Sequence, residues 1–438
     1  MRKTRCLMLP ALVLLSLLLI ACGLTGGDQE VLDEGAPSPV TAAPKLAGTT
    51  VTLPVESPSL PPTQKVIPTD ALQQARGQLV PALVEGQPLA GIMDLWVSPQ
   101  GDLWAATLDG IYIHTAEGWR RELKGVAIGK IAGSGSSGVV WALPYSTEAI
   151  FAYSGEKWKE YSRAQGWEPF HEAPYLSPGV AESVIESPER DIWLATGRDD
   201  LRRYDPDRDQ WEKFTAEQIG FPAYDEPDYQ GYFLTDVAIS GSGKVWVGSC
   251  IGQGELLAGR GVVRFSNGQW SSIDAVETAC VLDIEVLPDG DAYVGDYNHL
   301  FWYTPVTGNW RKDILPAFER FQLVERVDVD ASGQLWVQVR RMGGASSFGG
   351  MAVYYKQKYY GWVLVYESEG WADYDFAADP GGDVYFSSNG VVYRWRDRQL
   401  EELGALQATS TLLAVDGSGA VWAAPTGGSD DGLWQVAP

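Results

Sequence analysis

A short motif recurs along most of this 438-residue chain. It is usually a glycine, one or two further residues, and then an aromatic side chain followed by small or β-branched residues, as in GDLWAAT, GKVWVGS and GAVWAAP. A repeat with a spacing of about 45 residues is typical of proteins that stack one structural unit many times. The motif aromatics are Trp104, Trp141, Trp193, Trp246, Tyr293, Trp336, Tyr385 and Trp422.

Most copies are followed by an apolar strand, a tight turn and a second tryptophan. Each unit then reads as four short strands, which in the fourth copy are TDVAIS, KVWVGS, GVVRF and QWSSI. Val, Trp, Tyr and Thr between tight turns are the signature of strands, and no sustained helical periodicity follows residue 91. The second tryptophans are Trp119, Trp158, Trp211, Trp270, Trp310 and Trp371.

Four-stranded units at this spacing predict an all-β fold, a β-propeller with eight blades of four antiparallel strands. Seven blades are the alternative. The last unit ends at Pro438 just after its third strand. Closing the ring therefore needs an outer strand from the N-terminal side, around residues 62–82, which would also cover an exposed sheet edge.

The repeat pieces SPQGDLW, SGSGKVW, LPDGDAYVG, DASGQLW and DPGGDVY resemble the two-component regulator propeller repeat. This resemblance covers residues 91–438 and implies a propeller that serves as an extracytoplasmic sensor or binding module. The motif is also shared with virginiamycin B lyase-like propellers. That resemblance implies an enzyme with a histidine, an acidic partner and magnesium at the binding face, for which His171 and His299 are the candidates.

The N-terminus predicts export from the cytoplasm. A basic start precedes an apolar run from Leu7 to Ile20, the layout of a secretory signal peptide. The run ends in Leu-Ile-Ala-Cys22, which resembles the lipobox of bacterial lipoproteins and implies cleavage before Cys22 and acylation of that residue. An uncleaved membrane helix is the alternative. Several acyl chains anchor a protein stably, so we expect a lipid-anchored protein at the outer membrane or cell surface.

Three segments follow from composition: a signal peptide at 1–21, a lipidated tether at 22–75 and the propeller at 76–438. The tether is rich in Pro, Thr, Ser, Ala and Gly, and no aromatic residue precedes Trp96, so we expect a disordered spacer. The formal net charge of −24 argues against nucleic acid as a partner. With three histidines and four cysteines, we expect no cofactor and no metal site.

Long insertions suggest which face of the propeller binds. In an up-and-down blade, the loops after the second and fourth strands emerge on one face. The insertions 159–181 and 212–234 follow fourth strands, and 250–260 and 341–361 follow second strands. All four should therefore lie on that face. Its candidate binding residues are Trp167, Phe170, His171, Tyr175, Tyr224, Tyr229, Tyr232, His299, Tyr354, Tyr355, Tyr359 and Tyr360.

This aromatic face favours non-catalytic recognition of a protein, glycan or small ligand over catalysis. Packing of the loops on one another is the competing interpretation. The alternative functions are a lyase or hydrolase with acids at the central channel, and a structural subunit of an envelope complex. The two remaining cysteines, Cys250 and Cys280, fall on this face in adjacent units, and we expect a disulfide between them in an oxidising compartment.

Overall fold

The computed structural model describes residues 79–436, and these all belong to one compact unit, Val66–Pro438. Within that range the described residues exclude 134–137, 146–148, 168–182, 196–199, 222–231, 254–255, 274–275, 277–279, 288, 297–298, 314–321, 331, 345–346, 358–360, 369–374, 380, 407, 409–410 and 427–431. The structure describes the backbone alone at residues 183, 232–233, 251–253, 256–258, 313, 322, 341–344, 347–349 and 357.

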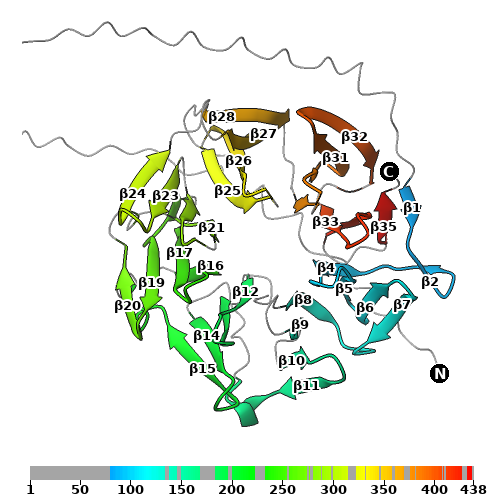
Figure 1. The fold of residues 1–438 in the computed structure, drawn as a ribbon, viewed down its shortest axis with the longest axis horizontal. Helices are drawn as coiled ribbons and strands as arrows, with labels where there is room; N and C mark the ends of the chain where they lie inside the picture. The colour runs from blue at the N-terminus through cyan, green and yellow to red at the C-terminus, as the bar shows by residue number, and fades with distance from the viewer. Residues whose placement is uncertain are drawn as a thin grey trace, which may run out of the picture. The chain divides into compact units, whose positions relative to one another are not determined.

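Eight sheets of four antiparallel strands surround a common axis, which confirms the eight-bladed propeller (Figure 1). Blade 1 comprises β4 (Ile92–Val97), β5 (Leu103–Thr107), β6 (Gly110–Thr115) and β7 (Gly118–Glu122). Blade 2 comprises β8 (Ile128–Gly133), β9 (Val140–Pro144), β10 (Ile150–Tyr153) and β11 (Trp158–Tyr161). A short 3-10 helix, η2 (Arg163–Gln165), precedes blade 3, which comprises β12 (Ser183–Glu186), β13 (Ile192–Ala195), β14 (Asp200–Asp205) and β15 (Gln210–Thr215).

Blade 4 comprises β16 (Tyr232–Ile239), β17 (Val245–Gln253), β19 (Val262–Ser266) and β20 (Gln269–Ser272), with β18 (Leu256–Ala258) paired to β17. Blade 5 comprises β21 (Asp283–Val286), β22 (Ala292–Gly295), β23 (Leu300–Thr304) and β24 (Asn309–Asp313). Blade 6 comprises β25 (Gln322–Val329), β26 (Leu335–Gly344), β27 (Ser347–Gln357) and β28 (Gly361–Ser368). Blade 7 comprises β29 (Phe376–Ala378), β30 (Val384–Ser388), β31 (Val391–Arg396) and β32 (Gln399–Ala405).

The last blade is completed by the first described strand. Blade 8 comprises β33 (Thr411–Val415), β34 (Val421–Pro425) and β35 (Trp434–Val436), and its outer strand is β1 (Leu79–Pro81). Leu79 pairs with Val436 and Pro81 with Trp434. This confirms closure by an N-terminal strand and places that strand at the end of the expected range. A small hairpin of β2 (Leu83–Val84) and β3 (Gln87–Pro88) follows β1.

Tryptophan pairs between adjacent blades explain why the repeat carries two aromatic positions. The motif tryptophan on the second strand of one blade contacts the second tryptophan, on the fourth strand of the following blade, at ring-centroid distances of 5.6 to 6.3 Å. The pair Trp422–Trp119 continues the pattern across the ring closure, at 5.7 Å. The other pairs are Trp104–Trp158, Trp141–Trp211, Trp193–Trp270 and Trp246–Trp310. These rings belong to hydrophobic clusters that fill the space between neighbouring sheets.

The polar part of the motif builds the turn between the first and second strands. In blade 8, Asp416 Oδ1 accepts hydrogen bonds from the backbone N–H of Ser418 and Ala420. Its Oδ2 accepts a hydrogen bond from Trp422 Nε1 at 2.8 Å. Asp330 does the same in blade 6, where Trp336 Nε1 lies 2.9 Å away. The Asp-x-Ser-Gly-x-x-Trp sequence is therefore a self-contained turn that fixes its own indole.

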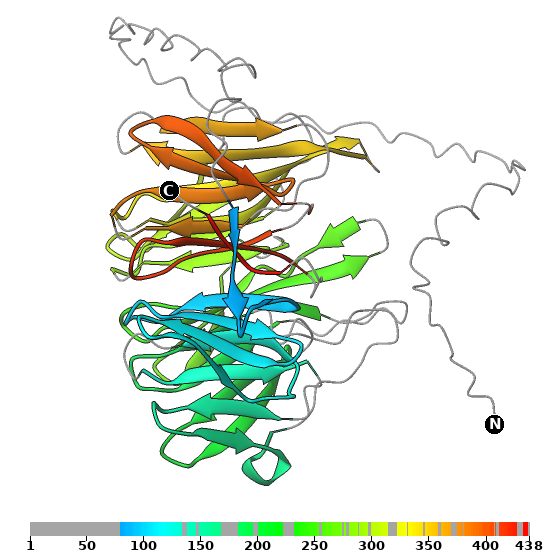
Figure 2. The ribbon, with the colours of Figure 1, turned by 90° about the vertical axis from the view of Figure 1, so that its right-hand side faces the viewer.

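The two ends of the ring differ. Connections between strands one and two, and between strands three and four, emerge at one end, which we call the turn face. Connections between strands two and three, and between successive blades, emerge at the opposite end, which we call the insertion face. Figure 2 shows strands projecting beyond the ring on one side and compact turns on the other. No described residue lies in a helix long and apolar enough to cross a membrane.

Candidate functional site

Two strand extensions shape the insertion face. β26 and β27 continue the second and third strands of blade 6 into a long hairpin that remains paired out to Gly344 and Ser347. In blade 4, β17 runs past the blade and pairs with β18. Both extensions leave the ring on the same side (Figure 2). Two of the four predicted insertions are thus ordered in part as extended strands, on the face that the sequence predicts.

Three of the predicted binding residues lie inside the molecule, which corrects their assignment to the binding face. The side chain of Trp167 is fully buried and packs against Trp211 at 5.0 Å. Tyr354 is buried between blades 5 and 6, and Tyr355 is buried between blades 6 and 7. Their apolar rings therefore stabilise blade packing. Tyr232 lies in β16 and is described by its backbone, while Phe170, His171, Tyr175, Tyr224, Tyr229, Tyr359 and Tyr360 lie outside the described residues, as does Cys22.

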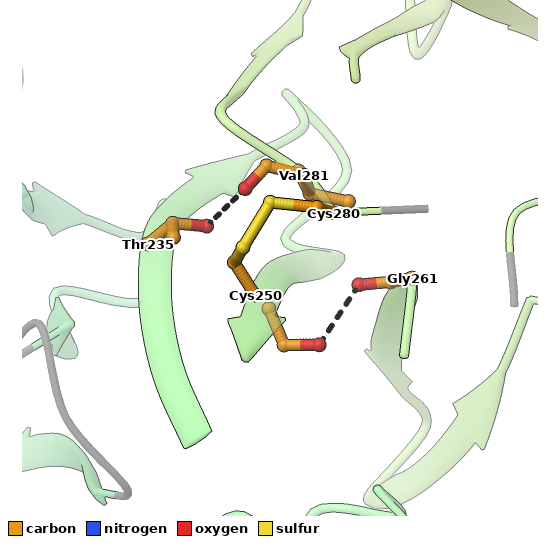
Figure 3. The surroundings of a disulfide bond; sticks show 6 residues. Thr235, Cys250, Gly261, Cys280 and Val281 are labelled. Atoms are coloured by element: carbon orange, nitrogen blue, oxygen red, sulfur yellow. Dashed lines mark hydrogen bonds between the residues drawn. A yellow bond between two sulfur atoms is a disulfide. The ribbon is translucent and has the colours of Figure 1, made fainter. Parts of the chain in front are cut away.

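The predicted disulfide joins Cys250 on β17 to Cys280, which precedes β21, with Cα atoms 4.4 Å apart. Both residues are buried. The bridge therefore fastens blade 4 to blade 5 at the insertion face. Next to it, the Thr235 hydroxyl donates a hydrogen bond to the Val281 carbonyl at 2.8 Å (Figure 3). The Val281 N–H donates to the Ser249 carbonyl at 3.0 Å, so the covalent link and two hydrogen bonds act at one junction.

His299 has the acidic neighbour that the lyase-like resemblance implies. It lies between the second and third strands of blade 5, and its Nδ1 is 3.3 Å from Asp296 Oδ1. The His299 side chain is 29% exposed, whereas that of Asp296 is 7% exposed. Burial raises the pKa of Asp296 to about 7, although the His299 backbone and Lys312 favour its charged form. No group of three or more possible metal ligands occurs among the residues that the structure describes.

Four aspartates on, or directly before, the innermost strands hold successive blades together. Each occupies the same register position, and its carboxylate accepts a hydrogen bond from a backbone N–H on the innermost strand of the next blade. These bonds are 2.6 to 2.9 Å long. The pairs are Asp94 with Ile131, Asp236 with Ile284, Asp283 with Val327 and Asp375 with Leu413. These four carboxylates therefore serve the architecture of the ring.

Cations occupy the same register position in blades 2 and 6. Lys130 lies 3.7 Å from Asp94, and Arg326 contacts both Asp375 and Asp328. Among the described residues, the charged groups linked by these contacts around the ring axis are six carboxylates and two cations. The carboxylates are Asp94, Asp236, Asp283, Glu285, Asp328 and Asp375. Burial raises the pKa of Asp94 and of Asp328, against the opposing effect of their basic neighbours. Burial raises the pKa of Asp283 well above its usual value, and Asp236 and Asp328 add to the shift.

Glu285 differs from the other axial acids because the architecture does not use its carboxyl group. It lies two residues after Asp283 on β21, and no described residue hydrogen-bonds to its side chain. Burial, with Asp328 and Asp236 nearby, raises the pKa of Glu285 to about 8. A carboxyl group with this pKa holds its proton at neutral pH and can donate it. Composition alone does not distinguish Glu285 from the other acidic residues, of which the chain has 57 in all. Its position in the strand register, where most blades carry Ala or an apolar residue, is the signal that identifies it.

No protein-family model and no curated protein matches this sequence. Among solved structures, the Dos1 propeller superposes with a TM-score of 0.55 at 8% identity, over 82% of this chain and 95% of that chain. A streptogramin B lyase superposes with a TM-score of 0.44 at 12% identity, over 82% and 96% of the two chains. The extracellular domain of a candidate one-component system from B. thetaiotaomicron gives 0.40 at 12% identity, over 80% of this chain and 52% of that chain. At such identities the likeness extends to the fold alone, which is that of a β-propeller.

Proposed function

We propose that this protein is an extracytoplasmic, lipid-anchored propeller that recognises a protein, glycan or small ligand through its insertion face. The asymmetry between the two ends of the ring carries this proposal. The β26–β27 hairpin and the β17–β18 extension both rise on the insertion face, while the turn face consists of tight turns. Insertions tolerated at random would be distributed over both ends, whereas binding loops concentrate on one end of a rigid scaffold.

The buried disulfide supports an extracytoplasmic location. Structural disulfides form and persist in oxidising compartments outside the cytoplasm. The bond between Cys250 and Cys280 lies at the insertion face, where it limits movement between blades 4 and 5. The signal peptide and the lipobox-like sequence ending at Cys22 support the same address, with acyl chains as the anchor.

The test is to shorten the blade 6 hairpin without altering the blade. Arg340 and Met351 form a direct cross-strand pair, so residues 341–350 can be replaced by an Asn-Gly turn. Residues 62–438 with the full hairpin should capture a partner from envelope extract, and the shortened variant should capture at least tenfold less. Both should unfold at similar temperatures. The control is Val306→Ser, which removes a 91%-exposed apolar side chain from the turn face and should leave capture unchanged. Equal capture by the shortened variant would contradict the proposal.

Glu285 favours a second candidate function, that of a lyase or hydrolase acting near the ring axis. A carboxyl group that holds its proton near neutral pH is suited to general acid catalysis. Envelope glycans and peptides would be incubated with the protein and with Glu285→Gln, which keeps the side-chain shape but cannot donate that proton. Products formed by the native protein and lost at least a hundredfold in the variant would favour the enzyme. Equal product from both proteins would exclude Glu285 as the acid.

A further inference from the structure

The Asp296–His299 pair lies at the part of the insertion face where blades 5 and 6 meet. The Asp296 carbonyl accepts a hydrogen bond at 2.9 Å from the N–H of Val324 on β25, and the Asp296 N–H donates to the His299 carbonyl at 3.0 Å. On the other side, the Leu282 N–H donates to the Gly295 carbonyl, which ties this turn to the segment that carries Cys280. Gly295 and Asp296 are therefore hydrogen-bonded to the chain segments on both sides of this site.

One oxygen of Asp296 is buried without a matching donor. No described residue donates a hydrogen bond to Oδ1, even though His299 Nδ1 lies 3.3 Å from it. A buried carboxylate oxygen without a donor is costly, and a small rotation of the imidazole would supply one. A proton between Nδ1 and Oδ1 would supply the hydrogen bond that Asp296 Oδ1 lacks.

Among the described residues, Lys312 on β24 is the charged group that favours the charged form of Asp296. On β25, the neighbouring acid is Glu325, whose carboxylate pairs with Arg340 on β26 at 2.6 Å. On β21, Asp283 accepts a hydrogen bond from Val327. Of these described charges, Lys312 is the one that acts directly on Asp296.

We propose that Asp296 and His299 share protons and that their deprotonation reverses the hydrogen-bonding character of the partly exposed imidazole at the insertion face. The pair holds either two titratable protons or one. When the pair holds two protons, one of them is on Nε2, and the second is either on the Asp296 carboxyl group or on Nδ1. With one, the carboxylate retains Nδ1–H and Nε2 is unprotonated. The lost proton goes to water, and Nε2 changes from donor to acceptor.

This inference rests on the proposed function, because it concerns regulation of binding at the insertion face. At lower pH the imidazole favours a ligand that offers an acceptor, such as a carboxylate or carbonyl oxygen. At higher pH it favours a ligand that offers an N–H or O–H donor. Histidine suits such a role because it titrates within the physiological pH range.

The first test needs no ligand. The chain contains three histidines, so imidazole signals of the isotope-labelled full chain can be assigned with His299→Gln and followed against pH by NMR. Asp296→Asn removes the opposite charge and should lower the titration midpoint of His299 by about one pH unit or more. The control, Asp289→Asn, removes an exposed carboxylate from the turn face of the same blade and should leave the midpoint unchanged. An unchanged midpoint in Asp296→Asn would overturn the pair.

The second test separates this inference from the proposed function. Capture from envelope extract by the full chain is compared at pH 6 and pH 8 with capture by Asp296→Asn. A severalfold change with pH in the native protein, absent from the variant, supports the inference. Capture that depends on the hairpin but responds equally to pH in both proteins would overturn the inference and leave the proposed function intact. If neither protein captures a partner at pH 6 or at pH 8, the result counts against the proposed function. The NMR titration of His299 would then decide whether the pair exists.

Discussion

At the scale of single residues, the residue that begins the turn before a motif tryptophan decides whether the buried indole N–H has a hydrogen-bond acceptor. Trp336 and Trp422 donate to Asp330 and Asp416. In blades 3 and 4 a serine, Ser187 or Ser240, begins the same turn. No described residue accepts a hydrogen bond from the indoles of Trp193 and Trp246. The repeat therefore tolerates serine there at the cost of a buried donor without a partner.

This difference predicts the effect of Asp416→Ser. Serine can still bond the turn backbone, as Ser240 does with Lys244, but it does not reach the indole. We expect the free energy of unfolding in urea to fall by about 1–3 kcal/mol, the cost of a buried unsatisfied donor. The matched control is Asp379→Ser in blade 7, where Tyr385 replaces the motif tryptophan and no indole depends on the carboxylate. Equal losses in the two variants would show that the indole bond contributes nothing.

At the scale of elements, the disulfide predicts a measurable stabilisation of the junction between blades 4 and 5. Cys250 and Cys280 are 30 residues apart. In the chain-entropy model, a loop of that length contributes about 3–4 kcal/mol by restricting the unfolded chain. Replacing both cysteines by serine should lower the free energy of unfolding by that amount under oxidising conditions. With reductant present during unfolding, the native protein and the variant should be equally stable. A native protein with two free thiols would refute the bridge.

At the same scale, local sequence patterns predict the blades themselves but not the hydrogen bonds between blades. The turn from Asp416 to Trp422 is built from residues within six positions of one another, so its repetition reveals the blades directly. The axial hydrogen bonds join residues in different blades, such as Asp94 and Ile131, and a bulge next to Asp94 shifts the strand register. Local patterns do not reveal such pairings. The sequence pattern does not separate the two roles of Tyr354 and Tyr355, because aromatic residues suit both ligand contact and blade packing. Only the strand register shows that they pack between blades.

At the scale of the whole molecule, the carboxyl groups that keep their protons near neutral pH predict how the free energy of unfolding depends on pH. The pKa of Glu285 is raised to about 8 and that of Asp296 to about 7, so both bind a proton more tightly in the folded chain than in the unfolded chain. Their contribution to stability is complete below the unfolded value, near pH 4, and is lost as the pH rises through the folded values. The free energy of unfolding should therefore fall between pH 5 and pH 8, by up to about 1.4 kcal/mol per pH unit for each such group. Glu285→Gln should flatten this decline in urea unfolding followed by tryptophan fluorescence, whereas Asp289→Asn should not. A stability that rises with pH over this range would show that these carboxyl groups are ionised in the folded ring.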